Sequence, residues 1–302
     1  MGVDEPKPQP KPPWSRPSLG RALMPLAGLV GNRFRPVIKT YALTPPGFPS
    51  LERPIRIAAL ADVHACKPWM TIARIEEIVA AANRLEPDLV VLLGDYVCAI
   101  FGWKRGVVPM SDWARALSGL KAPLGVFAVL GNHDWRAGGE EARAALEAHG
   151  VPVMENDVRL LRPDDGPAFW LAGLADQRVE ELGRGRFVGK DDLPGTLARI
   201  DEDAPVILLA HEPDIFLDVP HRVSLTLSGH THGGQCRFPL IGAPVVPSRY
   251  GQRYAYGHIV EDGRHLIVSG GLGYSGLPIR IGMPPEIVLI ELGGQPAFRP
   301  SP

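Results

Sequence analysis

Several histidines and carboxylates of this chain lie in short polar clusters with spacings that could hold metal ions. The clearest is LSGHTHGG (227–234), in which His230 and His232 stand two positions apart with glycine on both sides. Side chains two apart on an extended segment point to the same side, and imidazole is the commonest protein metal ligand. The glycines allow a sharp turn and a close approach to the backbone. On these eight residues alone, a pair of ordinary turn histidines explains the pattern equally well.

Similar clusters recur along the chain, each where an apolar run typical of a buried strand ends. They are Asp62-Val63-His64, Gly94-Asp95, Gly131-Asn132-His133-Asp134, His211 and His230-Thr231-His232. Ligands of open α/β sheets bind outside the carboxyl ends of the strands, so these clusters can converge. Carboxylate oxygen, amide oxygen and imidazole nitrogen together suit Mn, Fe or Zn. There are too many ligands for one ion, which favours two ions that share a carboxylate.

The elements that must position these clusters alternate between buried strands and amphipathic helices. We expect strands within 55–62, 88–95, 125–134, 205–214 and 223–227, and helices at 71–86, 140–150 and near 111–120 and 191–201. This order predicts an α/β domain whose sheets are buried on both faces. Segment 258–270 is typical of a hairpin with Asp262-Gly263 at its turn.

Composition limits the function further. With 302 residues, 45% of them hydrophobic, the chain can form one large domain or two. A net charge of −1 gives no reason to expect a nucleic-acid duplex as partner. The three cysteines, Cys66, Cys98 and Cys236, are too few and odd in number for a disulfide framework. We expect small buried thiols in a reducing, cytoplasmic compartment.

The N-terminal region differs from the rest. Residues 1–17 contain six prolines and are expected to be a disordered tail. Residues 18–50 form a basic amphipathic leader, whose nine-residue apolar run (22–30) is too short to span a bilayer. A helix that lies on an anionic membrane through residues 18–39, on the inner face of the plasma membrane, fits this pattern; a helix packed on its own domain is the alternative. The folded domain is expected at 51–293, and a tail at 294–302.

The ordered motifs D-x-H, G-D, G-N-H-D, H and G-H-x-H, over residues 55–292, resemble those of the calcineurin-like metallophosphoesterases. The longer form SGHTHGGQ is similar to a bacterial branch whose members usually carry an N-terminal membrane or export segment. That branch includes UDP-diacylglucosamine pyrophosphatases of lipid A synthesis. The resemblance implies an α/β fold with two mixed β-sheets in a central sandwich flanked by helices.

The resemblance also implies roles for individual residues. Two divalent ions are expected, with Mn²⁺ first and Fe, Zn or Mg as alternatives. Asp62, His64 and His232 would hold the first ion, Asn132, His211 and His230 the second, and Asp95 would bridge the two with one oxygen for each.

The implied chemistry is hydrolysis of a phosphodiester or pyrophosphate bond by a hydroxide that the two ions share. His133 would not bind metal but would protonate the leaving oxygen or bind a phosphoryl oxygen. Arg280 and Arg249 are candidate phosphate contacts, because arginine pairs well with phosphate oxygens. Asp134 is a candidate support for His133.

Three hypotheses about function remain. The first is an enzyme for a lipid-linked substrate such as UDP-diacylglucosamine, with Phe101, Trp69 and Trp103 as an apolar lip. The second is a soluble phosphodiesterase for cyclic nucleotides or small diesters. The third is a non-catalytic scaffold, which is disfavoured because all seven candidate ligands and His133 are present. A protein phosphatase is disfavoured as well, since Cys98 stands where that branch has an aspartate.

Overall fold

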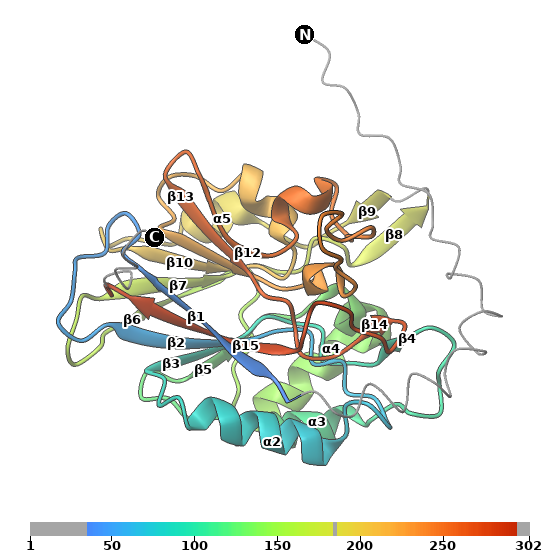
Figure 1. Cartoon of the computed structure of the whole chain (residues 1–302). Coiled ribbons are helices and arrows are strands. Elements are labelled where there is room, and N and C mark those ends of the chain that lie inside the picture. Colours follow the sequence, from blue (N-terminus) through green and yellow to red (C-terminus); the bar gives the residue numbers. More distant parts are fainter. Residues whose placement is uncertain (1–34, 184–185, 295–302) are drawn as a thin grey trace, which may run out of the picture.

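Two β-sheets form the centre of the structure, a computed structural model that describes residues 35–183 and 186–294 (Figure 1). The first sheet has the order β1 (Val37–Leu43), β15 (Glu286–Leu292), β2 (Ile55–Leu60), β3 (Leu89–Leu92), β5 (Val126–Ala128). The second has the order β12 (Gly257–Glu261), β13 (Arg264–Val268), β11 (Leu225–Ser228), β10 (Val206–Leu209), β7 (Phe169–Gly173), β6 (Asp157–Leu161). The prediction of two mixed sheets is therefore confirmed.

The direction of the strands determines where the site lies. In the first sheet β2, β3 and β5 run parallel, and in the second β7, β10, β11 and β13 run parallel. The carboxyl ends of each set therefore share one edge of their sheet. β12 and β13 form the expected hairpin, whose antiparallel register ends at Glu261 and Arg264 on either side of Asp262-Gly263.

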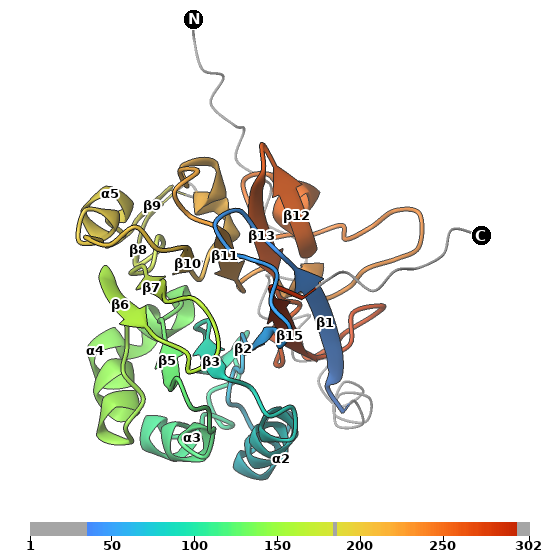
Figure 2. The ribbon, with the colours of Figure 1, turned by 90° about the vertical axis from the view of Figure 1, so that its left-hand side faces the viewer.

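Helices cover the outer face of each sheet. Figure 2 shows α2 (Ile72–Asn83), α3 (Met110–Leu117) and α4 (Asn132–Ala148) together along the first sheet. The short helix α5 (Leu193–Leu197) and the 3₁₀ helix η2 (Pro213–Leu217) pack on the second sheet. Within the described residues, no helix is both long and apolar enough to cross a membrane.

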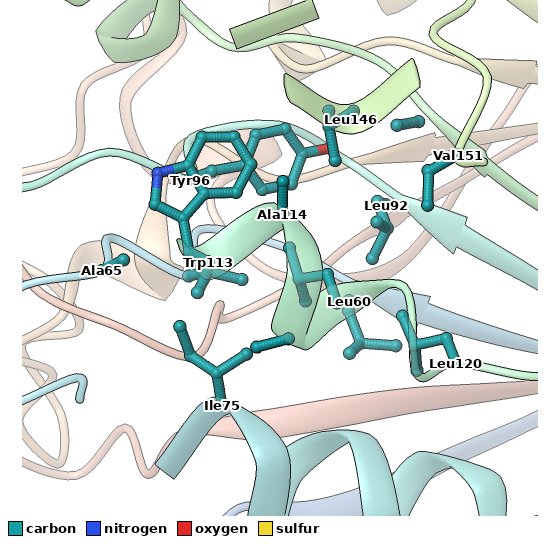
Figure 3. Packing of buried hydrophobic residues seen from close by; sticks show 14 of the residues in the cluster. Leu60, Ala65, Ile75, Leu92, Tyr96, Trp113, Ala114, Leu120, Leu146 and Val151 are labelled. Carbon is teal, nitrogen blue, oxygen red and sulfur yellow. The ribbon is translucent and has the colours of Figure 1, made fainter. Parts of the chain in front are cut away.

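Alternate residues of the buried strands point into different layers, as the period of two requires. In β2, Ile57 belongs to the layer between the sheets, whereas Leu60 belongs to the layer under the helices. Figure 3 shows this second layer, in which Trp113 of α3 lies beside Tyr96. The two rings stack with their centroids 5.1 Å apart, and the Tyr96 hydroxyl donates to Val129 O. Because Tyr96 follows Asp95 directly, this packing anchors one of the candidate metal loops.

Two elements extend beyond the expected boundaries. Residues 37–43, which the sequence analysis assigns to the leader, form β1 and pair with β15 along the whole strand. The folded unit thus begins before residue 51, and the remainder of the predicted leader and tails (1–34 and 295–302) lies outside the described residues. Helix α4 begins at Asn132 and is broken by a non-helical residue at Gly138 (φ 128°), so the helix expected at 140–150 is its second part and a further helical stretch precedes the kink. The GNHD motif therefore forms a helix N-terminus.

The remaining elements are short. β4 (Ala99–Ile100) pairs with β14 (Ser275–Gly276) (Figure 1), and β8 (Glu180–Gly183) pairs with β9 (Arg186–Val188). The 3₁₀ helices η3 (His232–Gly234) and η4 (Gly251–Tyr254) follow β11. The helix expected near 191–201 is reduced to the five residues of α5.

The expectation of three free thiols is wrong for two of them. Cys66 and Cys98 form a disulfide, with their Cα atoms 5.0 Å apart, and only Cys236 of the described cysteines is free. The loops after β2 and β3 run side by side, and Ala65 N donates to Tyr96 O at 2.7 Å. This pairing brings together two cysteines that are 32 positions apart. The cysteine count therefore no longer supports a reducing compartment.

Candidate metal centre

The polar clusters at the strand ends converge on one buried space. Asp62 and His64 follow β2, Asp95 follows β3, Asn132 begins α4 just after β5, His211 follows β10, and His230 and His232 follow β11. All seven side chains are buried, His230 being the most exposed at 6%. Five of them have a left-handed backbone, with φ between 46° and 68°: Asp62, His64, Asp95, His230 and His232. Such a conformation costs about 1–3 kcal/mol per residue and is typical of functional sites.

The glycines of the motifs allow the candidate ligands to pack this closely. A Cβ atom added to Gly131 would lie 2.4 Å from Asp95 Oδ1, and one added to Gly229 would lie 2.9 Å from Asp62 Oδ2. Both separations are shorter than real Cβ contacts, so a side chain at either position would displace a candidate ligand. The flanking glycines are therefore explained by the close approach of carboxylates to the backbone.

The first donor cluster joins Asp62, His64 and His232. His64 Nδ1 lies 2.8 Å from Val97 O and donates to it, so its Nε2 presents a lone pair. This Nε2 lies 3.1 Å from His232 Nε2, and His232 Nε2 lies 3.6 Å from Asp62 Oδ1. Burial and neighbouring positive charge lower the pKa of His64 and His232, which keeps both rings available as neutral ligands.

The second donor cluster joins Asp95, His211 and His230. His211 Nδ1 donates to Leu93 O at 2.6 Å, and His230 Nε2 lies 2.9 Å from both Pro247 O and Arg178 Nη1. The remaining nitrogens, His211 Nε2 and His230 Nδ1, face one another at 3.3 Å, and Asp95 Oδ2 lies 3.2 Å from His211 Nε2. Burial disfavours a charged His211, yet the facing Asp95 carboxylate outweighs it and raises the His211 pKa. Without an ion, a proton stabilises these facing acceptors.

The amide end of Asn132 completes this cluster, 3.0 Å from His230 Nδ1. Without a cation, the better orientation turns the NH₂ group toward His230 and lets the oxygen accept from Arg136. A bound cation would favour the reverse orientation, because only the oxygen of Asn132 can be a ligand. Asn132 is therefore placed to serve as a neutral oxygen donor.

Asp95 lies between the two clusters. Its Oδ1 accepts from the backbone N of His133 at 2.8 Å. Its Oδ2 lies 3.7 Å from His64 Nε2 and 3.2 Å from His211 Nε2. One oxygen therefore faces both clusters, whereas the sequence analysis expected one oxygen for each ion. Burial acts to raise the Asp95 pKa, but the adjacent His211 and His133 outweigh it and hold that pKa well below its usual value.

His133 and Asp134 have separate surroundings. The His133 ring stands edge-on to that of His64, with centroids 5.3 Å apart, and burial lowers the pKa of His133 to about 4. Within the described residues, no hydrogen bond joins the Asp134 side chain to the His133 ring. Its carboxylate accepts four backbone N–H bonds, at 2.8–3.1 Å, from Asp95, Tyr96, Val97 and Gly131. It therefore joins the loop after β3 to the start of α4.

The donor chemistry fits two divalent ions. Each cluster brings imidazole nitrogens and a carboxylate oxygen to one space, and no two facing donors named above are more than 3.7 Å apart. Two donors of one ion, each roughly 2.0–2.2 Å from it, lie at most roughly 4.4 Å apart. Mixed nitrogen and oxygen ligands of this kind suit Mn, Fe or Zn.

A known family matches the part of the sequence that contains all seven candidate ligands. Positions 55–234 match the family model "Calcineurin-like phosphoesterase". The chain belongs to this family. It is accordingly a metal-dependent phosphoric ester hydrolase.

Relatives of this phosphoesterase cover most of its length. It is 32% identical over 255 residues to the metallophosphoesterase YkuE of Bacillus subtilis, covering 83% of this chain and 82% of YkuE. It is 30% identical over 245 residues to the phosphodiesterase YaeI of Escherichia coli, covering 79% and 82%. Among solved structures, the NAD nucleotidase of Haemophilus influenzae is 18% identical with a TM-score of 0.47, covering 72% of this chain and 45% of that one.

The two arginines expected to meet phosphate have different positions in the phosphoesterase. The Arg280 guanidinium donates to Gly270 O, Gly273 O and Met283 O and lies 3.2 Å from His232 Nδ1. Arg280 would have to give up some of these hydrogen bonds before it could contact a phosphate. Arg249 is exposed, and its backbone N donates to Asp214.

Three polar residues near the second cluster were missed by the sequence analysis. Asp176 and Arg178 follow β7, and Glu212 follows His211. Arg178 Nη1 lies 2.9 Å from His230 Nε2 and 3.3 Å from Pro247 O, and its guanidinium stacks 4.0 Å from the centroid of the Phe187 ring. The signal was available, because Asp176 and Arg178 also stand just beyond the carboxyl end of a buried strand.

Proposed function

We propose that this phosphoesterase hydrolyses phosphodiester or pyrophosphate bonds with two divalent ions, Mn²⁺ first among them. Asp62, His64 and His232 would hold the first ion, Asn132, His211 and His230 the second, and Asp95 would bridge them. The observation that carries the proposal is that each cluster contains a ring nitrogen with a lone pair aimed at a carboxylate, because the outer ring nitrogens of His64 and His211 already donate to backbone carbonyls.

When bound, such an ion pair lowers the pKa of a water and offsets the charge that builds on phosphoryl oxygens. The protein residues would do the rest. His133, with its pKa of about 4, is neutral near pH 7 and suits donation of a hydrogen bond to a phosphoryl or leaving oxygen. Arg178 supplies positive charge beside the second cluster, and the exposed Arg249 follows Pro247 closely in the same loop.

The surroundings of the first cluster support a substrate presented at a membrane surface. Four segments meet there: 63–75, 96–111, 233–256 and 269–285. The disulfide and the β4–β14 pair join the second segment to the first and fourth, and Arg237 N donates to Ile281 O. None of the 33 acidic residues lies in these segments. They carry the exposed basic residues Lys67, Lys104, Arg105, Arg249 and Arg253, of which Arg253 pairs with Glu261 just outside these segments.

The same segments expose apolar side chains. Leu240 is fully exposed and Ile241 is 69% exposed, in the turn between the paired residues Phe238 and Gly242. The other exposed large hydrophobic residues of these segments are Phe101, Val107, Phe238 and Ile281. Of the predicted aromatic lip, Phe101 is exposed, whereas Trp69 is buried against Trp103. Basic and apolar groups without acids are typical of surfaces that bind anionic bilayers.

We therefore propose a lipid-linked phosphodiester or pyrophosphate, such as UDP-diacylglucosamine, as the substrate, with peripheral contact to an anionic membrane. The alternative is an enzyme that acts away from membranes on cyclic nucleotides or small diesters. This alternative predicts that turnover changes neither when vesicles are added nor when the exposed residues Leu240 and Ile241 are replaced.

A substrate panel with the Mn²⁺-loaded protein tests both alternatives. We expect turnover of a lipid-linked pyrophosphate in anionic vesicles to exceed that of cyclic nucleotides. Leu240→Asp should reduce vesicle turnover but leave hydrolysis of a small chromogenic diester unchanged. Val260→Asp, on the edge strand β12, is the matched control, because it adds the same charge at an exposed valine. Equal vesicle turnover by the Leu240 variant would favour the soluble alternative, and no hydrolysis of any diester would contradict the proposed function.

A further inference from the structure

A third group of potential ligands borders the second donor cluster. One carboxylate oxygen of Asp176, one of Glu212 and a ring nitrogen of His211 all lie within 4.8 Å of one another. Asp176 and Glu212 are 1% and 2% exposed. Two carboxylates so deeply buried need partners, because burial of an uncompensated charge is very costly.

Within the described residues, only one oxygen of each carboxylate accepts a hydrogen bond. Asp176 Oδ1 accepts from the backbone N of Arg178 at 2.7 Å, and Glu212 Oε2 accepts from the backbone N of Gln177 at 3.3 Å. The other two oxygens, Asp176 Oδ2 and Glu212 Oε1, have no hydrogen-bond partner and are shielded from solvent. Both side chains thus keep one unused oxygen, and each places an oxygen beside His211.

The shared histidine decides how many ions this arrangement can hold. His211 Nδ1 donates to Leu93 O, so Nε2 carries the only ring lone pair. A single lone pair binds one ion, and Nε2 already faces Asp95 Oδ2 and His230 Nδ1. The third group is therefore part of the second site rather than a separate one.

Distance selects Glu212 as the residue that completes this site. Glu212 Oε1 lies 4.0 Å from His230 Nδ1, within the roughly 4.4 Å that two donors of one ion can span. We propose that Glu212 is a further protein ligand of the second ion, with an oxygen of Asp176 within 4.8 Å of one of its own. The proposal rests on the two-ion function above.

With Glu212 as a ligand, the two ions would differ in their number of protein donors. The first would have four protein donors, from Asp62, His64, His232 and Asp95. The second would have five, from Asp95, Asn132, His211, His230 and Glu212. A site with five protein donors, several of them hard oxygens, favours ions that accept six ligands, such as Mn²⁺, over tetrahedral Zn²⁺.

The test is equilibrium binding of Mn²⁺ to the full-length protein after chelation, with bound ions counted by metal analysis. Wild-type protein should bind two ions. Glu212→Gln should weaken one of the two by at least about 10–100-fold, the loss typical of altered support at a metal site, and should weaken Zn²⁺ less. Asp176→Asn should give a smaller loss. Glu155→Gln is the matched control, because Glu155 Oε1 is also buried without a hydrogen-bond partner but belongs to none of the three donor groups.

The possible outcomes separate this inference from the proposed function. Two ions bound by Glu212→Gln with wild-type affinity would overturn the ligand role of Glu212. Three ions in the wild-type protein and two in this variant would overturn the shared site. Fewer than two ions in the wild-type protein would contradict the two-ion function itself. Glu212→Asp, which keeps the charge but shortens the reach, should also weaken one ion, and unchanged binding there refutes the proposal even if the glutamine variant fails to fold.

Discussion

Asp134 gives the sharpest test of how the fold positions the metal ligands. Its Oδ2 accepts from the backbone N of Asp95 and Gly131, and its Oδ1 from those of Tyr96 and Val97. Burial and the nearby Asp95 raise the pKa of Asp134 to about 7, while bonds from the backbone act in the opposite direction. At pH 8 the side chain is therefore a carboxylate that accepts four bonds.

Asp134→Asn should destabilise both the fold and the site at pH 8. The amide keeps one oxygen, so two charge-assisted bonds are lost and an NH₂ group faces two N–H donors. At about 1.5–3 kcal/mol for each bond to a charged group, the free energy of unfolding should fall by about 3–6 kcal/mol. Because the bonded amides fix Asp95 and the start of α4, the affinity for both ions should fall as well.

Denaturant unfolding and Mn²⁺ titration of Asp134→Asn measure the two effects. Asp88→Asn is the control, since the Asp88 carboxylate is also buried and also accepts from a backbone N, that of Arg56, outside the metal clusters. The control should lose some stability but bind ions as the wild-type protein does. A loss below about 1 kcal/mol for Asp134→Asn, together with unchanged ion affinity, would refute the reasoning.

Three further predictions follow from other parts of the structure. His133→Gln should reduce kcat by about 10²–10⁴-fold while metal analysis still finds two ions per chain; loss of an ion would contradict its role as a non-ligand. Burial lowers the pKa of His258 and His265, so the unfolded state binds more protons and stability should fall as pH drops below about 6.5. Unfolding curves of His265→Gln should show a weaker decline, and an identical decline would contradict the assignment. Replacing Cys66 and Cys98 by serine should lower the free energy of unfolding by about 3–4 kcal/mol, the closure entropy of a loop of this length; unchanged stability would argue against the disulfide.

The sequence predicted the architecture and the meeting of the clusters because both depend on short-range patterns. Continuous apolar runs marked β2, β3 and β10, and in parallel sheets the residues after such strands reach a common edge. The same rule applied to β7 would have found Asp176 and Arg178. They were missed because no histidine drew attention to that strand end.

Other features depend on contacts distant in sequence. Edge strand β1 is held by β15, some 250 positions away, and its first four residues are exposed, so its segment carries no strong strand pattern. The Cys66–Cys98 bond depends on two loops that run side by side. Arg280 is fixed by carbonyls of its own loop, which its identity as an arginine could not reveal. Nor could the sequence show that a single oxygen of Asp95 faces both clusters.

The central claim is that one buried space holds two divalent ions joined by Asp95. Its most direct test is metal analysis of purified protein, wild type and Asp95→Asn, after equilibration with Mn²⁺. We predict two ions per wild-type chain, weakened binding of both ions in the variant and loss of most diester hydrolysis. One ion per wild-type chain, or a variant that keeps both ions and full turnover, would contradict the account.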